Sequence, residues 1–343
     1  MVRAPPNRCQ TGVRARRRRE ALCYPAAVRA AIVAVGSELL STDRLDTNSL
    51  RITERLERRG VALVAKSVIG DDEPGLEREL RRWLAQCELV VVTGAGNGIG
   101  RATAHAFAAR GARLAICDVD RARVDAVAAE LGPRCAHASQ VDVGDRPAMA
   151  GFAAAVHAVG PVDVLVNNAG VGYQGGVLRA SLDDWDHVLR VNLMGVIHGC
   201  HYFTPAMAQR GRGHVVNVSS VLGYYPAPGL APYVVSKFGV LGLTLAMRPE
   251  LEVKGVRATA ICPGLIATGI VDSTRFASFD GKNQARAAKE FRDRGTAPEV
   301  VAAAIVGVIG TDTAVRPVAR DAWFAYGVSR WMPRLIGDRL GRM

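Results

Sequence analysis

From about residue 30 onward, two kinds of apolar pattern alternate along the chain. Short continuous runs predict strands, and runs spaced by three, four or seven residues predict helices with one apolar face. In chain order the pattern predicts a strand at 31–35, a helix carrying Leu45, Ile52 and Leu56, a strand at 61–64, a helix at 76–84 and a strand at 89–92. This order is typical of an α/β segment.

The strand that ends at Thr93 runs directly into a glycine-rich turn, from Gly94 to Gly100, and then into a predicted helix at 101–110. Glycines in such a turn let the backbone approach a pyrophosphate, which binds the free N–H groups and the positive dipole end of the helix. The following strand at 113–117 ends at Asp118, the usual place for an acid that accepts hydrogen bonds from ribose hydroxyls. The sequence therefore predicts a dinucleotide site.

Asp118 also bears on which dinucleotide binds. A carboxylate there repels the 2′-phosphate of NADP, and the turn carries no lysine or arginine, so NAD is favoured. Arg121 lies close enough in sequence to accommodate that phosphate, which keeps NADP as the alternative. Another interpretation of Asp118 and Arg121 is a solvated charge pair at the start of a helix.

A tyrosine and a lysine four residues apart, Tyr233 and Lys237, share one helix face. An ammonium beside the phenol is expected to lower the tyrosine pKa from about 10 toward neutral pH. A tyrosine tuned in this way can exchange a proton with a carbonyl or alcohol oxygen. Ser220 follows the apolar strand at 215–218 and is expected to hydrogen-bond that same oxygen.

Together these motifs resemble the short-chain dehydrogenase/reductase family over about residues 89–319. The resemblance implies a doubly wound parallel α/β sheet (Rossmann), an NAD(P)(H)-dependent oxidoreductase and a homo-oligomer. It implies Tyr233 as general acid/base, Lys237 as modulator of its pKa and ligand of the nicotinamide ribose, Ser220 as holder of the substrate oxygen, and Asn192 as support for a water that links Lys237 to solvent. The implied cofactor contacts are Gly94, Asn97, Gly98, Ile99, Gly100, Asp118, Asp142, Val143, Asn168, Ala169, Gly170, Tyr233, Lys237, Pro263, Gly264, Ile266 and Thr268.

The segment at 31–93 is similar to the first half of the molybdopterin-binding-type domain found in competence-damage-inducible protein A. The matching sequence motifs are Gly36-Ser37-Glu38-Leu39-Leu40, Asp46-Thr47-Asn48-Ser49 and Gly70-Asp71-Asp72. The family's pterin-binding loop is expected after Gly94, where this chain has the dinucleotide turn instead. We therefore expect three parts: a basic disordered tail at 1–29, a partial α/β segment without a pterin site at 30–88, and a dehydrogenase domain at 89–343.

The net charge of +12 does not indicate a nucleic-acid partner. Eight arginines and one acid lie within residues 1–29, so only +5 belongs to the remaining chain, which is ordinary for a soluble protein. Contact with nucleic acid or membrane, or organellar targeting, is the alternative role of the tail. The seven cysteines show neither C-x-x-C pairs nor metal-ligand spacing. We expect no metal site, reduced buried thiols and a cytoplasmic location.

The segments around the predicted site bear on the substrate. Residues 221–230 are apolar and aromatic without acid or base, which favours a hydrophobic or lipid-like alcohol or carbonyl, although the same side chains suit packing on the core or a second subunit. Basic residues at 275–294 suit either an anionic substrate group or a solvated helix face. Aromatic and arginine residues alternate at 323–342, which suits docking on the core or peripheral contact with a membrane.

The predicted function is thus an oxidoreductase that interconverts a hydrophobic secondary alcohol and a carbonyl compound. The alternatives are a non-catalytic dinucleotide-binding protein and a gene-junction chimera whose N-terminal half-domain is a relic.

Overall fold

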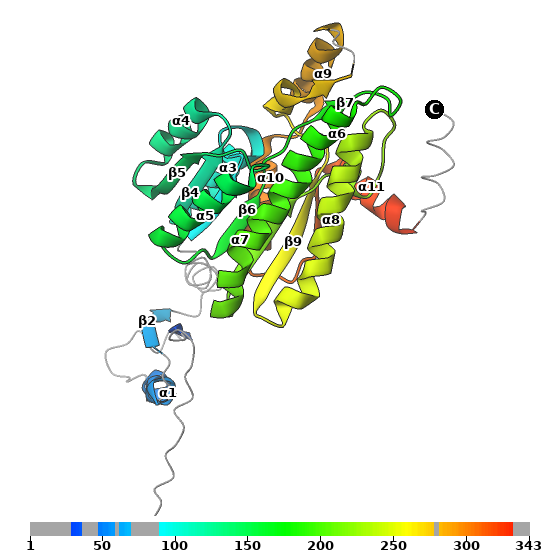
Figure 1. Ribbon diagram of the computed structural model, residues 1–343. Helices are drawn as coiled ribbons and strands as arrows, with labels where there is room; N and C mark the ends of the chain where they lie inside the picture. Colours follow the sequence, from blue (N-terminus) through cyan, green and yellow to red (C-terminus); the bar gives the residue numbers. More distant parts are fainter. Residues whose placement is uncertain (1–28, 36–46, 59–61, 70–88, 278–280, 332–343) are drawn as a thin grey trace, which may run out of the picture.

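The computed structural model describes residues 29–35, 47–58, 62–69, 89–277 and 281–331 (Figure 1). Near the N-terminus, β1 (Arg29–Val35) and β2 (Ala62–Ile69) form a two-stranded parallel sheet, and α1 (Thr47–Glu57) connects them in the chain. Both strands and this helix were predicted, with β2 continuing past its expected end. The expected helix at 76–84 and residues 1–28 of the expected tail lie outside the described residues, whereas Arg29, the last residue assigned to the tail, is the first residue of β1.

The main sheet has seven parallel strands in the order β11-β9-β8-β6-β3-β4-β5. The chain order reverses between the neighbours β3 and β6, which makes the sheet doubly wound and confirms the predicted fold class. The third strand of the N-terminal run, β3, pairs here with β4 and β6. The strands are β3 (Leu89–Thr93), β4 (Arg113–Asp118), β5 (Cys135–Gln140), β6 (Val164–Asn167), β8 (Gly213–Val218), β9 (Val256–Pro263) and β11 (Val315–Val318).

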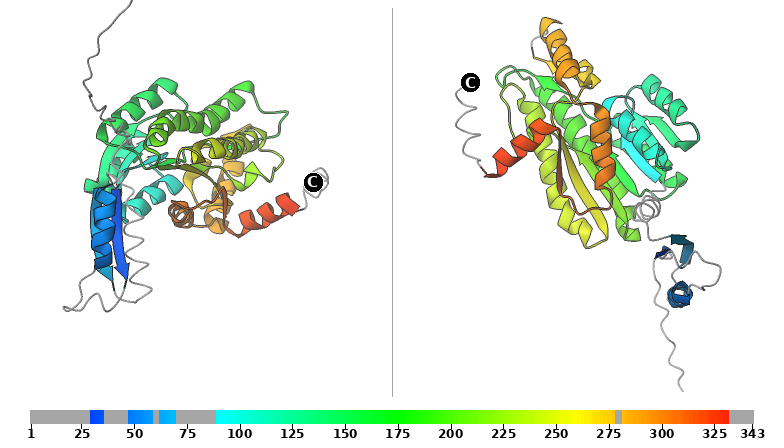
Figure 2. Two further views of the ribbon diagram at one scale, coloured as in Figure 1. Left: turned by 90° about the horizontal axis from the view of Figure 1, so that it is seen from below. Right: turned by 180° about the vertical axis from the view of Figure 1, so that it is seen from behind.

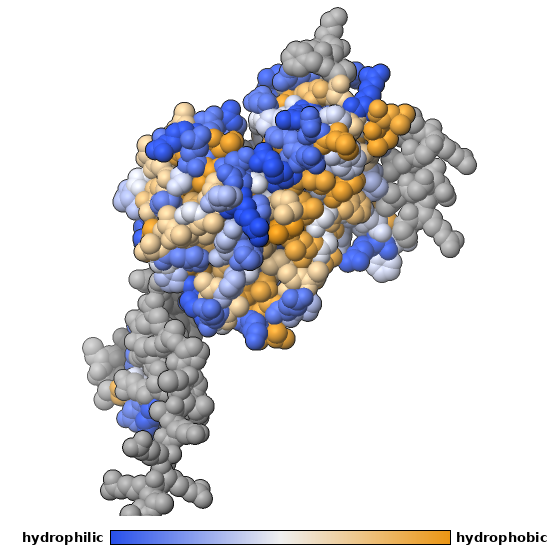
Figure 3. All heavy atoms as spheres, viewed as in Figure 1, coloured by the Kyte–Doolittle hydropathy of each residue, from blue (hydrophilic) through white to orange (hydrophobic). Residues whose placement is uncertain are grey.

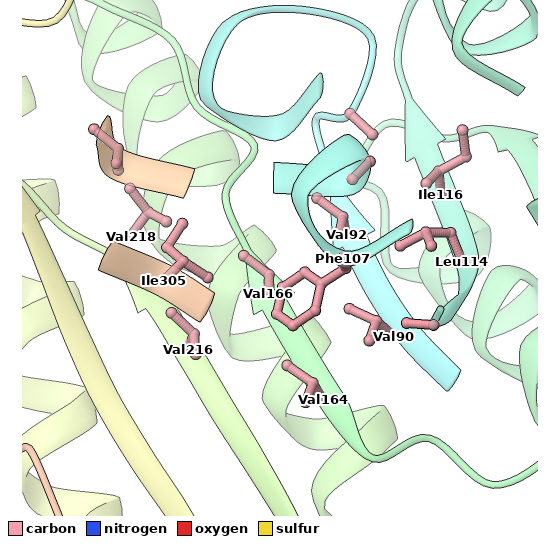
Figure 4. Packing of buried hydrophobic residues seen from close by; sticks show 14 of the residues in the cluster. Val90, Val92, Phe107, Leu114, Ile116, Val164, Val166, Val216, Val218 and Ile305 are labelled. Carbon is pink, nitrogen blue, oxygen red and sulfur yellow. The ribbon is translucent and has the colours of Figure 1, made fainter. Parts of the chain in front are cut away.

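Helices cover both faces of this sheet because its strands are apolar on both sides (Figure 2). Along β3, Val90 and Val92 pack into one cluster, shown in Figure 4, and Leu89 and Val91 pack into the other. The first cluster is closed by α3 (Gly98–Ala108), α4 (Arg121–Leu131) and α10 (Pro298–Val308), and the second by α5 (Arg146–Val159), α7 (Gly195–Arg210) and α8 (Ala231–Glu252).

Shorter elements and two further helices complete the described part of the chain, several of them beyond the carboxyl ends of the strands. The strand β7, which follows β6, pairs with β10, which follows β9, so the segments after these two strands are joined. The shorter elements are η2 (Gly132–Arg134), β7 (Tyr173–Gln174), α6 (Leu182–Leu189), the π-helical turn η3 (Arg190–Met194), η4 (Val221–Gly223), η5 (Gly269–Ser273), β10 (Arg275–Phe276), α9 (Gly281–Arg294) and α11 (Arg320–Trp331).

The described cysteines are all free, as expected. Cys117, Cys200 and Cys262 are buried, and Cys135 is partly buried. Within the described residues, no group of three or more His, Cys, Asp or Glu side chains could hold a metal ion. The same part of the chain contains no helix with the length and apolar character needed to cross a membrane.

Candidate active site

The glycine-rich turn lies after β3, at the reversal point of the sheet. Gly94 has φ of +62°, in the left-handed region that favours glycine, and a Cβ there would lie 2.7 Å from the Cα of Ala169. A Cβ on Gly100 would collide with the Gly94 carbonyl oxygen. The turn therefore needs glycine for its own packing, and it leaves a cradle beside the first turn of α3.

The helix α3 begins three residues earlier than the sequence predicted. Asn97 is its N-cap, and its side-chain oxygen accepts a hydrogen bond of 2.7 Å from the N–H of Gly98. The first helical N–H groups, including that of Ile99, have no partner within a helix, so this end suits an anion. The predicted residues Asn97 to Gly100 thus form a site that fits a pyrophosphate.

Hydrogen bonds connect this turn and the end of β3 to the residues that directly follow β6. The side-chain amide of Asn168 donates to the carbonyl oxygens of Thr93 and Gly94 at 3.0 and 3.1 Å. The hydroxyl oxygen of Thr93 accepts from the N–H groups of Asn168 and Ala169 at 3.0 and 3.2 Å. Sequence reasoning placed Asn168 to Gly170 in this cleft but missed Thr93, whose only signal was a polar residue at the end of a buried strand.

Asp118 lies at the end of β4, next to the turn. Its carboxylate accepts hydrogen bonds from the N–H of Gly96 at 2.8 Å and from the N–H of Asp120 at 3.0 Å. Arg121 forms an ion pair with Asp125 at 2.7 Å. The alternative interpretation of Asp118 and Arg121 as a charge pair is therefore wrong, and the Asp118 carboxylate is held at the cleft by backbone groups.

Asp142 and Val143 follow β5 on the same edge of the sheet. The Asp142 carboxylate accepts from the N–H of Gly144 at 2.8 Å and pairs with Arg190 at 2.7 Å. Val143 is buried, and its carbonyl oxygen lies 2.9 Å from Nδ1 of His198. Sequence reasoning missed Arg190, which ties Asp142 to the π-helical turn.

Asn192 lies inside that π-helical turn, whose coil is wider than that of an α-helix. The side chain is fully buried and reaches across to the segment after β6. Its oxygen accepts from the N–H of Val171 at 2.7 Å, and its amide donates to the Val171 carbonyl at 3.0 Å and to the Ser236 hydroxyl at 3.1 Å. The Asn192 side chain therefore joins three elements of the site.

Tyr233, Lys237 and Ser220 meet at the carboxyl end of β8. Lys237 is 4% exposed, donates to the Val218 carbonyl at 3.0 Å, and lies over the Tyr233 ring with Nζ 5.6 Å from its centre. Ser220 is buried, and its hydroxyl oxygen accepts from the N–H of Leu222 at 3.1 Å. Tyr233 is half-buried and hydrogen-bonded with the Ser220 side chain.

Burial determines the pKa values of this pair. It raises the pKa of Tyr233 to about 12, although the hydrogen bond with Ser220 acts in the opposite direction. It lowers the pKa of Lys237 to about 8. The sequence-based expectation for Tyr233 was wrong in direction, because burial of the phenol raises its pKa and Lys237, which lies over the ring, donates its hydrogen bond to the Val218 carbonyl.

The segment from Pro263 to Thr268 completes the cleft from the side of β9. The N–H of Gly264 donates to the Val318 carbonyl at 2.9 Å, and Ile266 is buried. A Cβ on Gly98 would lie 2.9 Å from the methyl carbon of Thr268, so this segment reaches the glycine-rich turn. A cavity of about 740 Å³ begins at Asn97, Gly98 and Thr268 and extends along α3 and α10 as far as Arg110 and Ala303; Tyr233 is not among its lining residues.

The segments expected to contact substrate contain one side chain that packs on the core and several arginines that form ion pairs. The Tyr224 hydroxyl donates to the Ala322 carbonyl in α11 at 2.8 Å, so this side chain packs on the core, as the alternative interpretation had it. In the segment after Thr268, Arg275 lies 3.6 Å from Asp184, and Arg294 lies 3.5 Å from Glu290. Paired, exposed arginines favour the solvated-face interpretation of this segment.

Comparisons with known proteins show the family of the chain. The family model for short chain dehydrogenase matches residues 88–277, more than half of the chain. The chain belongs to the short-chain dehydrogenase family. A relative from Mycobacterium tuberculosis, "Probable oxidoreductase EphD", is 42% identical over 259 residues, which are 72% of this chain but 44% of that protein. The meso-2,3-butanediol dehydrogenase of Serratia marcescens is 36% identical over 66% of this chain and 88% of its own.

Solved structures of the family have the same fold. A short-chain dehydrogenase from Burkholderia phymatum, solved in complex with NAD, has a TM-score of 0.67 and 29% identity over 74% of this chain and 95% of its own. A 3-ketoacyl-(acyl-carrier-protein) reductase from Brucella melitensis, complexed with NADH, has a TM-score of 0.60 and 26% identity over 68% and 97%. A second family model, for a probable molybdopterin binding domain, matches residues 31–115 and confirms the N-terminal resemblance.

Proposed function

We propose that this protein is an NAD-dependent dehydrogenase or reductase for hydrophobic secondary alcohols and the matching carbonyl compounds. The observation that carries the proposal is the meeting of Tyr233, Ser220 and Lys237 at the end of β8, on the sheet edge that holds the glycine-rich turn. NAD, when bound, supplies the hydride chemistry.

The residues of the cleft suit the cofactor. The N–H groups at the start of α3 would hold the pyrophosphate, and Asp118 would accept hydrogen bonds from the adenosine ribose. Lys237 would donate to the nicotinamide ribose, and Thr268 would meet the same end of the cofactor. Support for the adenosine end comes from Asp118, whose carboxylate is already fixed by two backbone N–H groups.

In this mechanism Tyr233 moves the proton. During reduction its hydroxyl donates a proton to the carbonyl oxygen of the substrate, and during oxidation the tyrosinate takes the proton from the alcohol. The Ser220 hydroxyl holds the substrate oxygen in place. Asn192 supports the arrangement by fixing Val171 and Ser236 around Lys237, and it supports the proposed water that links Lys237 to solvent.

The phenylalanine variant at Tyr233 tests the role of its hydroxyl. Tyr233→Phe should lose turnover by at least about a hundredfold, the usual contribution of a general acid or base, while NADH still binds with nearly unchanged affinity. Tyr202→Phe in α7 is the matched control and should keep activity. Full activity of Tyr233→Phe would refute the assignment. Tight NADH binding without turnover by the native protein would favour a non-catalytic binding protein.

NAD is proposed over NADP because the Asp118 carboxylate, which accepts hydrogen bonds from backbone N–H groups, would repel a 2′-phosphate. Arg121, the residue able to offset it, is paired with Asp125. The native protein should therefore have a higher kcat/KM with NAD than with NADP. Asp118→Ser should reduce the ratio of the kcat/KM with NAD to the kcat/KM with NADP. Equal use of both cofactors by the native protein would contradict this preference.

The substrate class and the assembly follow from apolar surfaces. Residues 221–230 carry no acid or base, so medium- and long-chain alcohols should react faster than polyols.

Val235, Phe238 and Leu245 are exposed along α8, where Figure 3 shows hydrophobic residues at the surface, and a second copy of the chain would cover them. Sedimentation of the native protein and of Phe238→Glu tests this proposed homo-oligomer.

A further inference from the structure

Helix α11 has an inner and an outer face of different character. Ala322 and Ala325 are buried against the core. Phe324 and Trp331 are 76% and 86% exposed, and Arg320 is exposed as well. Because Arg320, Phe324 and Trp331 are four and seven residues apart, they lie on one side of the helix. This outer face is apolar and open to solvent.

Two arginines lie along one flank of the outer face. The guanidinium of Arg316 lies 5.5 Å from the ring centre of Trp323, and that of Arg330 lies 5.6 Å from the ring centre of Tyr326. Asp321 is the one acid between residues 315 and 331, and its carboxylate accepts a hydrogen bond of 3.0 Å from the N–H of Leu265. The aromatic rings are therefore bordered by arginines whose charge is not balanced on this helix.

The inner side of α11 touches the loop that leaves the catalytic serine. Tyr224 donates to the Ala322 carbonyl, and its ring packs edge to face with Tyr326 at 5.3 Å. The element η4 lies between Ser220 and Tyr224. One side of α11 thus contacts the loop that follows Ser220, and the outer face is directed away from this contact.

We propose that the outer face of α11 binds the surface of a membrane that contains anionic lipids. Aromatic side chains favour the boundary between headgroups and acyl chains, and each arginine near that surface is attracted by anionic headgroups. A second copy docked symmetrically on this face would bring the same arginines against each other, which disfavours self-association here. The proposal does not depend on which cofactor or substrate the enzyme uses.

Flotation of the full chain with lipid vesicles tests the proposal. Vesicles of phosphatidylcholine with phosphatidylglycerol should bind the protein, and vesicles of phosphatidylcholine alone should bind it much more weakly. The double variant Phe324→Ser/Trp331→Ser should weaken binding at least about tenfold, because two large apolar side chains are no longer transferred from water into the membrane. Leu178→Ser is the matched control, since Leu178 is 98% exposed elsewhere, and it should bind like the native protein.

Charge variants separate this surface from the basic tail. Arg320→Gln and Arg330→Gln should each weaken binding to the anionic vesicles about fivefold. Replacing Arg16 to Arg19 by glutamine in the full chain should leave most of the binding. The proposal is overturned if the tail variant abolishes binding while the α11 variants bind normally. It is also overturned if the α11 variants change only the sedimentation mass, because α11 would then contact a second copy.

Discussion

Lys237 should reduce the stability of this protein at neutral pH. Lys237 is 4% exposed, and burial lowers the pKa of its ammonium from 10.5 to about 8. Such a shift corresponds to about 3 kcal/mol of preference for the neutral form in the folded state. At neutral pH the side chain is nevertheless charged, so folding carries most of this cost.

The pH dependence follows from the direction of the shift. Between pH 8 and pH 10.5 the unfolded chain binds this proton more strongly than the folded protein, so the contribution of Lys237 to the free energy of unfolding rises with pH. Below pH 8 the lysine is protonated in both states and the full cost is present. Above pH 10.5 it is neutral in both, and the cost disappears.

Replacement of the lysine by methionine should therefore stabilise the protein while removing activity. Lys237→Met keeps the length of the side chain and removes the charge, but it loses the hydrogen bond to the Val218 carbonyl, roughly 1 kcal/mol. The net gain at pH 7 should be about 2 kcal/mol in the free energy of unfolding. Urea unfolding without added cofactor, followed by circular dichroism at several pH values, measures it.

The exposed Lys254 provides the control for this experiment. Lys254→Met should change the free energy of unfolding by less than about 0.5 kcal/mol at any pH. The advantage of Lys237→Met should shrink steadily as the pH rises from 8 to 10. A variant that is less stable than the native protein at pH 7, or a difference that does not vary with pH, would show that the ammonium is not desolvated and would refute the reasoning.

Three further predictions concern the loop, the π-helical turn and the N-terminal segment. Gly100→Ala should abolish NADH binding in a fluorescence titration, because its Cβ would collide with the Gly94 carbonyl, whereas Gly151→Ala on the open surface of α5 should not weaken it. Asn192→Ala should lower the free energy of unfolding by about 2 to 4 kcal/mol and reduce kcat more than it raises KM, since a buried side chain loses three hydrogen bonds. A chain beginning at Gln86 should keep NADH binding and turnover; loss of its fold in circular dichroism would show that the N-terminal segment is integral.

The sheet and the position of the site could be predicted from sequence because both depend on local signals. Buried parallel strands produce continuous apolar runs, and a turn such as Gly94 to Gly100 is needed wherever the backbone must approach a pyrophosphate. The carboxyl ends of parallel strands meet at one edge, so the strand that precedes Ser220 already placed it beside this turn. The helix positions of Tyr233 and Lys237 followed from their spacing.

Other features depend on contacts between distant residues and have no local signal. The ion pair of Asp142 with Arg190 joins residues that are 48 positions apart. The hydrogen bond between Asn168 and Thr93 joins residues that are 75 positions apart. The direction of the Tyr233 pKa shift depends on how completely water is excluded, which spacing along a helix does not reveal. Tertiary packing decided these features.

The strand β3 decides how the two family resemblances coexist in one chain. The two family models overlap at residues 88–115, which include β3 and the glycine-rich turn. A strand offers two edges, and those of β3 are paired with β4 and β6 over Val90 to Val92. Neither β1 nor β2 pairs with it, so this strand is not available to extend the small N-terminal sheet. In the loop after β3, where the pterin site of the other family is expected, Asn168 donates a hydrogen bond to the Gly94 carbonyl and Asn97 caps α3, an arrangement that suits the proposed dinucleotide site. The strand that the N-terminal pattern predicts as its third is therefore part of the seven-stranded sheet, and β1 and β2 form a separate two-stranded sheet.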